Sequence, residues 1–319
     1  MPQPSSSDVH VDAILSQLSI AFIQSQDAYI ASRVFPTISV AKQSDKYFIY
    51  TKGDWFRDEA QLRAPATPSA GSGYGLSTAT YNADVYAMHK DVDDQTRANA
   101  DDPLNPDRDA TQFVTQRMLM RQEIDWSSSF FTTGVWDTDV VGGTNFTQWS
   151  NYTSSDPIED VETGKATILN STGFLPNTLV LSYDAMRQLR NHPDIVDRIK
   201  YTSANTPTEA TLASLFGVDR VMTARAIKNS GAEGAADSLG AVHGKNAALY
   251  YVAPNPGILT PSAGYQFAWD GVSDGQGTTV GISRFRMNEL RADRIEAQMA
   301  WDYKVVSSDL GYFFSNCVA

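Results

Sequence analysis

The side chains that could carry out acid–base, nucleophilic or metal chemistry are few and dispersed. The four histidines are His10, His89, His192 and His243, and none is paired with another histidine or a cysteine at metal-ligand spacing. The single cysteine, Cys317, excludes an internal disulfide and fits a reducing compartment. We interpret Cys317 as a small apolar side chain near the C-terminus.

Short motifs of known chemistry are approached but not completed. Residues 70–73, Ala-Gly-Ser-Gly, fall short of the G-x-S-x-G pattern of serine hydrolases. The same glycine-rich run lacks the third glycine of a dinucleotide-binding turn, because position 76 is leucine. Residues 137–139 begin like a calcium loop, but Val141 and Gln148 occupy positions that need acids.

The tripeptide His192-Pro193-Asp194 resembles the motif of chaperone-stimulating J domains, but it lies in an α/β pattern instead of between two long helices. We interpret it as a break between helices, with Asp194 capping the next turn. The catalytic, cofactor-binding and metal-ligand sets therefore stay empty, and we expect no enzyme. A hydrolase or sugar-binding protein with a pocket near residues 178–225 is the alternative from another class.

Composition and charge narrow the class of protein further. The chain has 319 residues, of which 42% are apolar and 11% aromatic, so it can bury a large core. Its net charge of −12 argues against a broad nucleic-acid-binding surface, which needs clustered lysine and arginine. There is no run of 18 apolar residues and no secretion signal, so we expect no membrane span.

The element that must organise the rest is a long helix predicted over residues 107–136. Asn105-Pro106 supplies its start and Gly134 its end, which gives a strut of about 35–40 Å. A two-sided helix of this length needs a sheet or another subunit to cover its apolar stripe. The positions that define the predicted stripe are Phe113, Met120, Ile124 and Phe131.

Extended structure is predicted on both sides of this helix. Strands over residues 46–55 and 80–88 flank a tip rich in glycine and proline, and an oversized hairpin of this kind needs cover from outside itself. Residues 294–306 alternate apolar and polar side chains, which predicts a long strand whose apolar face packs on the helix. Between them, residues 178–252 read as a small α/β unit with a helix starting at Thr206.

An apolar N-terminal arm over residues 8–30, with an amphipathic helical pattern, completes the set. A strut helix, a long strand, a projecting hairpin and an apolar arm without a catalytic cluster are typical of a subunit whose surface is its function. We therefore predict self-assembly.

Seven segments carry a family pattern: residues 51–57 (TKGDWFR), 85–94 (VYAMHKDVDD), 97–100 (RANA), 191–199 (NHPDIVDRI), 261–265 (PSAGY), 284–287 (RFRM) and 309–314 (DLGYFF). As a set they resemble the major capsid proteins of tailed bacteriophages, and the resemblance covers the chain from about Asp8 to Ala319.

The resemblance implies an α+β fold of the Hong Kong 97 type. Its parts are an N-terminal arm, an extended E-loop β-hairpin, a peripheral domain with a spine helix and a long strand, and an α/β axial domain. The implied boundaries are 1–44 for the arm, 45–92 for the E-loop, 93–174 for the peripheral domain, 175–262 for the axial domain and 263–319 for a C-terminal return to the peripheral domain.

The implied function is a structural subunit that forms hexamers and pentamers and closes into an icosahedral shell around double-stranded DNA, without sequence-specific binding. The implied partners are further copies of the chain, a portal and a decoration protein. A separate scaffolding protein is also expected, because only about 44 residues precede the hairpin. The implied location is the virion, after assembly in the host bacterial cytoplasm. An encapsulin-like shell of the same fold is the alternative.

Some relatives join subunits covalently through a lysine of the E-loop. Lys46 and Lys52 lie in that region, but no motif identifies the asparagine and glutamate that the reaction needs, so we expect non-covalent contacts. The residues predicted to contact neighbouring subunits are Lys52, Trp55, Arg57, Arg63, Tyr74 and Phe22.

Overall fold

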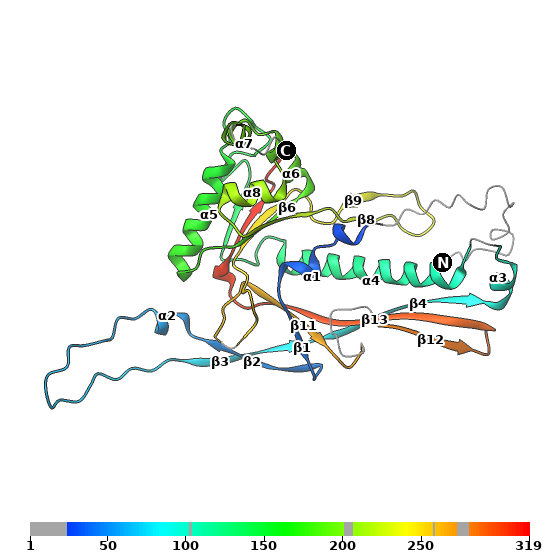
Figure 1. Cartoon of the computed structure of the whole chain (residues 1–319), viewed down its shortest axis with the longest axis horizontal. Helices are drawn as coiled ribbons and strands as arrows, with labels where there is room; N and C mark the ends of the chain where they lie inside the picture. Colours follow the sequence, from blue (N-terminus) through cyan, green and yellow to red (C-terminus); the bar gives the residue numbers. More distant parts are fainter. Residues whose placement is uncertain (1–23, 102–103, 201–206, 258, 273–280) are drawn as a thin grey trace.

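The structure is a computed structural model that describes residues 24–101, 104–200, 207–257, 259–272 and 281–319. Figure 1 shows three parts: a block of helices around a short sheet, a long sheet covered by one long helix, and a hairpin that projects from their junction. The arm helix predicted over residues 8–30 lies largely outside the described residues, and Phe22 lies outside them entirely.

The predicted long helix is α4 (Pro106–Phe130), and its 25 residues span about 37 Å. Its start is as predicted: Pro106 occupies the first turn, and the Asn105 side chain accepts a hydrogen bond from the Arg108 amide at 3.1 Å. The helix ends before Gly134, at Phe130. The Phe130 carbonyl accepts hydrogen bonds from Trp136 Nε1 at 2.7 Å and Tyr250 Oη at 2.8 Å, so side chains outside the helix fix this end.

The buried face of α4 differs from the predicted stripe. Phe113, Met120 and Ile124 are only half-buried, although Phe131 is buried just beyond the helix. The helix residues that are buried are Ala110, Val114, Met118, Gln122, Glu123, Trp126 and Phe130. The prediction missed this face because it counted large apolar residues, whereas the packed stripe includes a small alanine and two polar side chains.

The large sheet is built around β13 (Ala292–Val305). Strand β4 (Asp84–Asp93) pairs along one side of β13. On its other side, β13 pairs with β12 (Gly281–Met287) along its first half and with β11 (Gly264–Trp269) along its last residues. Strand β1 (Thr37–Val40) pairs with the outer edge of β11.

The alternation predicted for β13 is confirmed. Its odd-numbered residues from Ile295 to Tyr303 are buried, and α4 packs against this strand, with the Phe130 and Tyr303 rings 5.5 Å apart between centroids. The predicted pairing of the strut helix with the long strand therefore holds.

A second sheet forms the core of the helical block. Its strand order is β5 (Thr138–Val141), β14 (Gly311–Ser315), β10 (Ala247–Tyr250), β6 (Thr178–Ser182) and β7 (Arg220–Ala224). The surrounding helices are α5 (Pro157–Thr172), α6 (Tyr183–Asn191), α7 (Pro193–Ile199) and α8 (Glu209–Phe216).

This block is larger than the predicted axial unit. It recruits β5 and α5 from the segment assigned to the peripheral domain, and β14 from the C-terminal segment 263–319. The apolar residues 311–315 pair with β10 and β5, which are far away in sequence. Pairing over such separations leaves no local signal in the chain.

The start of helix α8 differs from the sequence prediction. The helix begins at Glu209, because the Thr208 hydroxyl accepts from the Thr211 amide at 3.3 Å, while Thr206 lies outside the described residues. It ends at Gly217, which has a φ of +61°. A short hairpin of β8 (Ile227–Asn229) and β9 (Leu239–Ala241) follows β7.

The projecting hairpin consists of β2 (Ser44–Tyr50), the short helix α2 (Lys52–Trp55) and β3 (Leu76–Asn82). The second predicted strand is divided at Ala83, because β3 pairs with β2 while β4 leaves the hairpin and pairs with β13. The hairpin is therefore shorter than the predicted 45–92.

Residues 24–37, which we call the strap, cross from the helical block to the large sheet. They contain η1 (Gln26–Ala28) and α1 (Ala31–Val34). The fully buried Glu123 of α4 holds them: its Oε2 atom accepts from the Ile30 amide at 3.0 Å and the Ala31 amide at 2.8 Å. Its Oε1 atom lies 3.0 Å from Nε2 of the buried His243.

The far end of the large sheet is fastened by charge. Short helix α3 (Asp94–Asn99), the start of α4, β12 and β13 each contribute to one network. Its members are Asp94, Asp107, Asp293, Arg97, Arg284 and Arg286.

Asp293 is the centre of this network. Its carboxylate oxygens lie 2.5 Å from a guanidinium nitrogen of Arg284, 2.9 Å from one of Arg97 and 3.3 Å from one of Arg286. These contacts lower the pKa of Asp293 from 3.8 to about 2. The hydrogen bond from Arg284 is the main cause, and Arg286 and Arg97 add to it.

Replacing Glu123 by glutamine tests the buried anchor of the strap. The amide offers one acceptor oxygen, and its NH2 group faces N–H donors, so we expect a loss of about 1–3 kcal/mol in the free energy of unfolding. Amide exchange at Ile30 and Ala31 should accelerate. Urea unfolding and hydrogen exchange measure both effects. The control is Glu162→Gln on the exposed side of α5, and equal stability of the two variants would contradict the assignment.

The Asp293 network predicts a specific dependence on pH. Above about pH 4 Asp293 is ionised in the folded and the unfolded chain, so its contribution to stability is complete. That contribution disappears as the pH falls from about 4 towards the folded-state pKa of about 2. The urea midpoint of the wild type should exceed that of Asp293→Asn at pH 6, and the difference should shrink by pH 2.5. A constant difference would refute the prediction.

Candidate assembly surface

One face of the hairpin is rich in exposed aromatic and aliphatic side chains. Residues paired directly across a hairpin share a face, so Phe48 and Tyr50 of β2 lie on the same side as Leu76 of β3. Phe48 is 60% exposed and Leu76 is 52% exposed. The opposite face carries Tyr47 and Tyr81 against the body of the molecule. The hairpin therefore has one covered face and one open face.

Three aromatic rings extend the open face at the hairpin's outer part. The ring centroids of Trp55 and Tyr74 are 5.5 Å apart, and Tyr50 lies 6.2 Å from Trp55 and 5.9 Å from Tyr74. Trp55 is 55% exposed and Tyr74 is 62% exposed. We call Phe48, Tyr50, Trp55, Tyr74 and Leu76 the aromatic face. Such clusters on a rigid support are typical of protein–protein contacts.

Backbone contacts position the aromatic face. The Thr51 amide donates to the Gly75 carbonyl at 3.2 Å, and the Gly75 amide donates to Asp54 Oδ2 at 2.8 Å. A Cβ at position 75 would lie 2.7 Å from Thr51 Oγ1, so a larger residue would have to displace the Thr51 side chain. The result is that α2 is tied to the start of β3, which keeps Trp55 beside Tyr74.

The structure places the predicted contact residues in two groups. Trp55 and Tyr74 come together in the aromatic face. The charged residues are engaged within the chain: Lys52 forms an ion pair with Asp309, and Arg57 lies 3.4 Å from Asp54. Arg63 Nε donates to the Thr67 carbonyl at 2.6 Å at the hairpin tip. Whether these residues contact a neighbouring subunit stays a prediction.

Sequence reasoning missed four exposed apolar residues of the hairpin. They are Phe48, Phe56, Leu62 and Leu76, of which Leu62 at the tip is completely exposed. Alternation along residues 44–50 could have placed Phe48 beside Tyr50. It could not have shown which face of the hairpin the body covers.

A serine, a histidine and an aspartate lie close together in the helical block, but they do not form a catalytic set. Ser155 Oγ is 2.8 Å from His192 Nε2, and Asp194 Oδ2 is 3.5 Å from His192 Nδ1. However, His192 Nδ1 accepts the Asp194 amide at 3.4 Å, and Ser155 Oγ donates to the Asn151 carbonyl at 2.7 Å. Nε2 must then carry the proton, so it cannot deprotonate the serine.

His192 instead caps α7, so the predicted helix break is correct but the capping residue is His192 and not Asp194. Burial lowers the pKa of His192, which favours the neutral ring that this cap requires. The cluster is therefore part of the fold.

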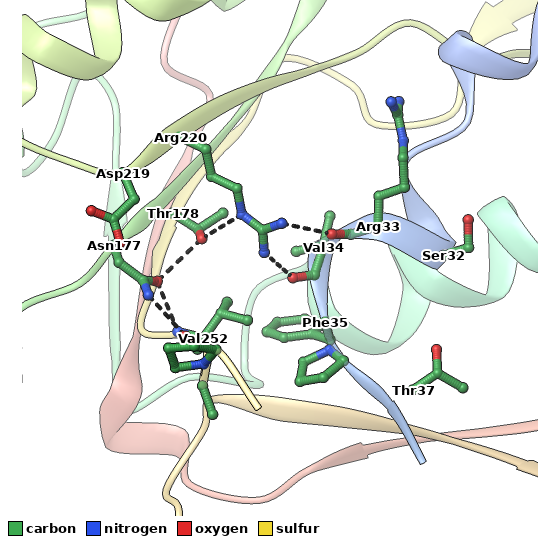
Figure 2. Close-up of a pocket in the computed structure, with 13 residues that line it drawn as sticks. Ser32, Arg33, Val34, Phe35, Thr37, Asn177, Thr178, Asp219, Arg220 and Val252 are labelled. Atoms are coloured by element: carbon green, nitrogen blue, oxygen red, sulfur yellow. Dashed lines mark hydrogen bonds between the residues drawn. The ribbon is translucent and has the colours of Figure 1, made fainter. Parts of the chain in front are cut away.

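A hollow of about 410 Å3 lies where the strap meets the second sheet, near the pocket expected for a hydrolase. Figure 2 shows Arg220 at its wall, donating to Thr178 Oγ1 at 3.0 Å and to the carbonyls of Arg33 at 3.0 Å and Val34 at 2.6 Å. Among the described residues that line the hollow, none is a histidine or a lysine, and the acidic side chain is Asp219. Arg220 holds the strap to the second sheet.

Metal sites and membrane-spanning helices were the remaining possibilities for the described residues. Within those ranges, no group of three or more His, Cys, Asp or Glu is arranged to hold a metal ion. Among the helices that the structure describes, none is both long enough and apolar enough to cross a bilayer.

Comparison of sequences finds phage capsid proteins among the relatives of this chain. The major capsid protein of Burkholderia phage BcepMu is 25% identical over 224 residues, which cover 68% of this chain and 69% of that protein. The major capsid protein of Pseudomonas phage JBD67 is 24% identical over 314 residues, which cover 97% of each chain. No protein-family model matches the sequence.

Comparison of structures agrees with this. A phage-related protein from Bordetella bronchiseptica RB50 is 26% identical, with a TM-score of 0.68 and 97% of each chain covered. The capsid of cyanophage P-SCSP1u gives 0.63 at 9% identity, with 97% of this chain and 93% of that chain covered. An encapsulin complex from Synechococcus elongatus PCC 7942 gives 0.52 at 12% identity, with 96% and 95% covered. The last two likenesses concern the fold alone. This chain is thus a homologue of phage major capsid proteins, has the Hong Kong 97-type capsid fold, and is a structural protein and not an enzyme.

Proposed function

We propose that this chain is the subunit of an icosahedral phage head, in which hexamers and pentamers of identical chains enclose double-stranded DNA. The observation that carries the proposal is the open aromatic face, on a hairpin that projects from a chain homologous over 97% of its length to a phage major capsid protein. An apolar face of this kind needs a partner, and further copies of the chain supply one.

The hairpin would act as the E-loop that lies on a neighbouring subunit. Trp55, Tyr74 and Phe48 would bury their rings on that neighbour, and Leu62 would make the outermost contact. The body contributes rigidity, because the ion pairs at its far end are satisfied within one chain. Burial of a few aromatic anchors accounts for most of the energy of a typical protein interface.

Other partners belong to this proposal as well. A separate scaffolding protein, a portal and a decoration protein would join the shell, and assembly would take place in the bacterial cytoplasm before the protein becomes part of the virion. The net charge of −12 supports a shell that encloses DNA without gripping its sequence.

An encapsulin-like shell is the second candidate, supported by the fold likeness to an encapsulin at a TM-score of 0.52. Both candidates predict closed particles. They differ in content, because the phage shell encloses DNA and the encapsulin-like shell encloses a protein cargo. The phage reading is favoured by the two capsid homologues.

Shortening the hairpin tip tests the proposal. Ser72 Oγ donates to Glu59 Oε2, so removing residues 60–71 joins two positions that already touch. The hydrogen bonds of the tip run within this stretch, from Arg63 to Thr67 and from Thr67 to Ala64. We expect an unchanged melting temperature but a large loss of shells in electron micrographs of the protein made with its scaffold. Normal shells from this variant would count against the proposal.

A single substitution tests the aromatic face separately. Trp55→Ser should weaken subunit association by about 30-fold, the effect of losing an interface anchor of about 2 kcal/mol, and leave the fold of the subunit intact. Trp55→Phe should retain most of the assembly. Sedimentation of capsomers and circular dichroism of subunits measure the two quantities. Equal assembly by both variants would show that Trp55 is not an anchor.

A further inference from the structure

The hairpin touches its own subunit in two zones of different character. At its root, the Tyr81 ring stacks on Phe267 with centroids 4.6 Å apart, and the Asn82 amide donates to Asp302 Oδ2 at 2.8 Å. Tyr81 and Phe267 are buried. This root zone belongs to the large sheet, since Phe267 lies on β11 and Asp302 on β13.

The second zone lies farther out and belongs to the helical block. Lys52 Nζ of α2 forms an ion pair with Asp309, which lies in η2 (Ser308–Leu310) directly before β14. Nearby, Phe56 approaches Gly173, the residue that ends α5: a Cβ on Gly173 would lie 3.5 Å from Phe56 Cε1. These contacts are open to water, with 45% of the Lys52 side chain and 64% of Phe56 exposed.

The two zones therefore fasten the hairpin to different bodies with different strength. The buried aromatic stack at the root is part of the folded core and persists as long as the subunit stays folded. An exposed ion pair changes a population only about 1.4- to 5-fold, so the outer contact opens easily. Directly after Asn82 of the root zone, β3 gives way to β4 at Ala83, whose amide donates to the Gln43 carbonyl at 2.8 Å. The outer part of the hairpin is therefore held less firmly than its root.

We propose that Lys52 and Asp309 form a latch that holds the hairpin along its own helical block and so sets the direction in which the aromatic face is presented to a neighbour. The inference rests on the proposed assembly function and adds a control to it. The latch prepares the free subunit for docking, and its weakness lets the hairpin adjust to the different neighbours in hexamers and pentamers.

The backbone next to Asp309 is held firmly by the helical block. The Leu310 carbonyl accepts from the Tyr251 amide at 2.9 Å. Gly311 lies against the Trp136 indole, where a Cβ would not fit. The position of Asp309 is thus fixed by the core of the helical block, and Lys52 is the side that moves. Lys52 also sits one residue after Thr51, whose amide is tied to Gly75, so moving Lys52 moves the aromatic face with it.

Distance measurement on the free, full-length subunit tests the latch. Spin labels at Ser69→Cys on the tip and Arg190→Cys on α6 are selective because the native Cys317 is buried. We expect the narrowest distance distribution in the wild type, a broader one in Lys52→Gln and the broadest in Asp309→Lys, which places two positive charges together. The exchange of charges in Lys52→Asp with Asp309→Lys should restore the narrow distribution. Lys42→Gln, which breaks an exposed pair with Asp45 at the start of β2, is the matched control.

Assembly kinetics provide the second measurement. Light scattering in the presence of the scaffold should show that Lys52→Gln slows shell formation about two- to five-fold, while the charge exchange restores the rate. Salt at 1 M should broaden the wild-type distribution, because it shortens the Debye length to about 3 Å and so weakens the attraction between exposed charges. The latch is refuted if Lys52→Gln matches the wild type in either distance distribution or rate. Failure of the wild type to form shells refutes the proposed function instead, and the distance measurement then still tests the latch.

Discussion

The buried carboxylate of Glu123 is the constraint on which the arrangement of this subunit depends. A carboxylate taken out of water costs several kcal/mol unless donors surround it. Here the donors come from outside its own helix: the Ile30 and Ala31 amides of the strap, with His243 of the helical block 3.0 Å away. The C-terminal half of α4, around Glu123, is thus where strap, large sheet and helical block meet.

Further polar contacts hold the strap in place along its length. Arg220 at the edge of the second sheet donates to the Arg33 and Val34 carbonyls, so the strap is held to the helical block as well as to α4. Burial lowers the pKa of Arg220, and the backbone carbonyls around it compensate for part of the lost hydration. The strap is therefore a part of the folded subunit.

Charge and apolar surface are divided between the two ends of the molecule. At the far end of the large sheet, Asp293 and its arginines satisfy one another within the chain, which makes that end stiff. At the hairpin, the aromatic face is left exposed by the residues that the structure describes, and the Lys52–Asp309 ion pair adds to the buried contacts at the hairpin root. A rigid body with one adjustable apolar element suits a subunit that must fit more than one set of neighbours, because rigidity limits the entropy lost on binding and adjustment permits different angles.

Elements whose signals are local could be predicted from the sequence. Asn105-Pro106 marked the start of α4, alternation marked β13, and glycine and proline marked the hairpin tip; residues 51–57 and the other segments carried the family resemblance. Tertiary structure alone decided what depends on distant pairing. It placed β14 between β10 and β5, divided β3 from β4 at Ala83, and buried Glu123 in place of Phe113. The physical reason is that hydrophobicity and backbone preference depend on a residue and its sequence neighbours. The residues that bury it and form hydrogen bonds with it, in contrast, come from segments far away in sequence.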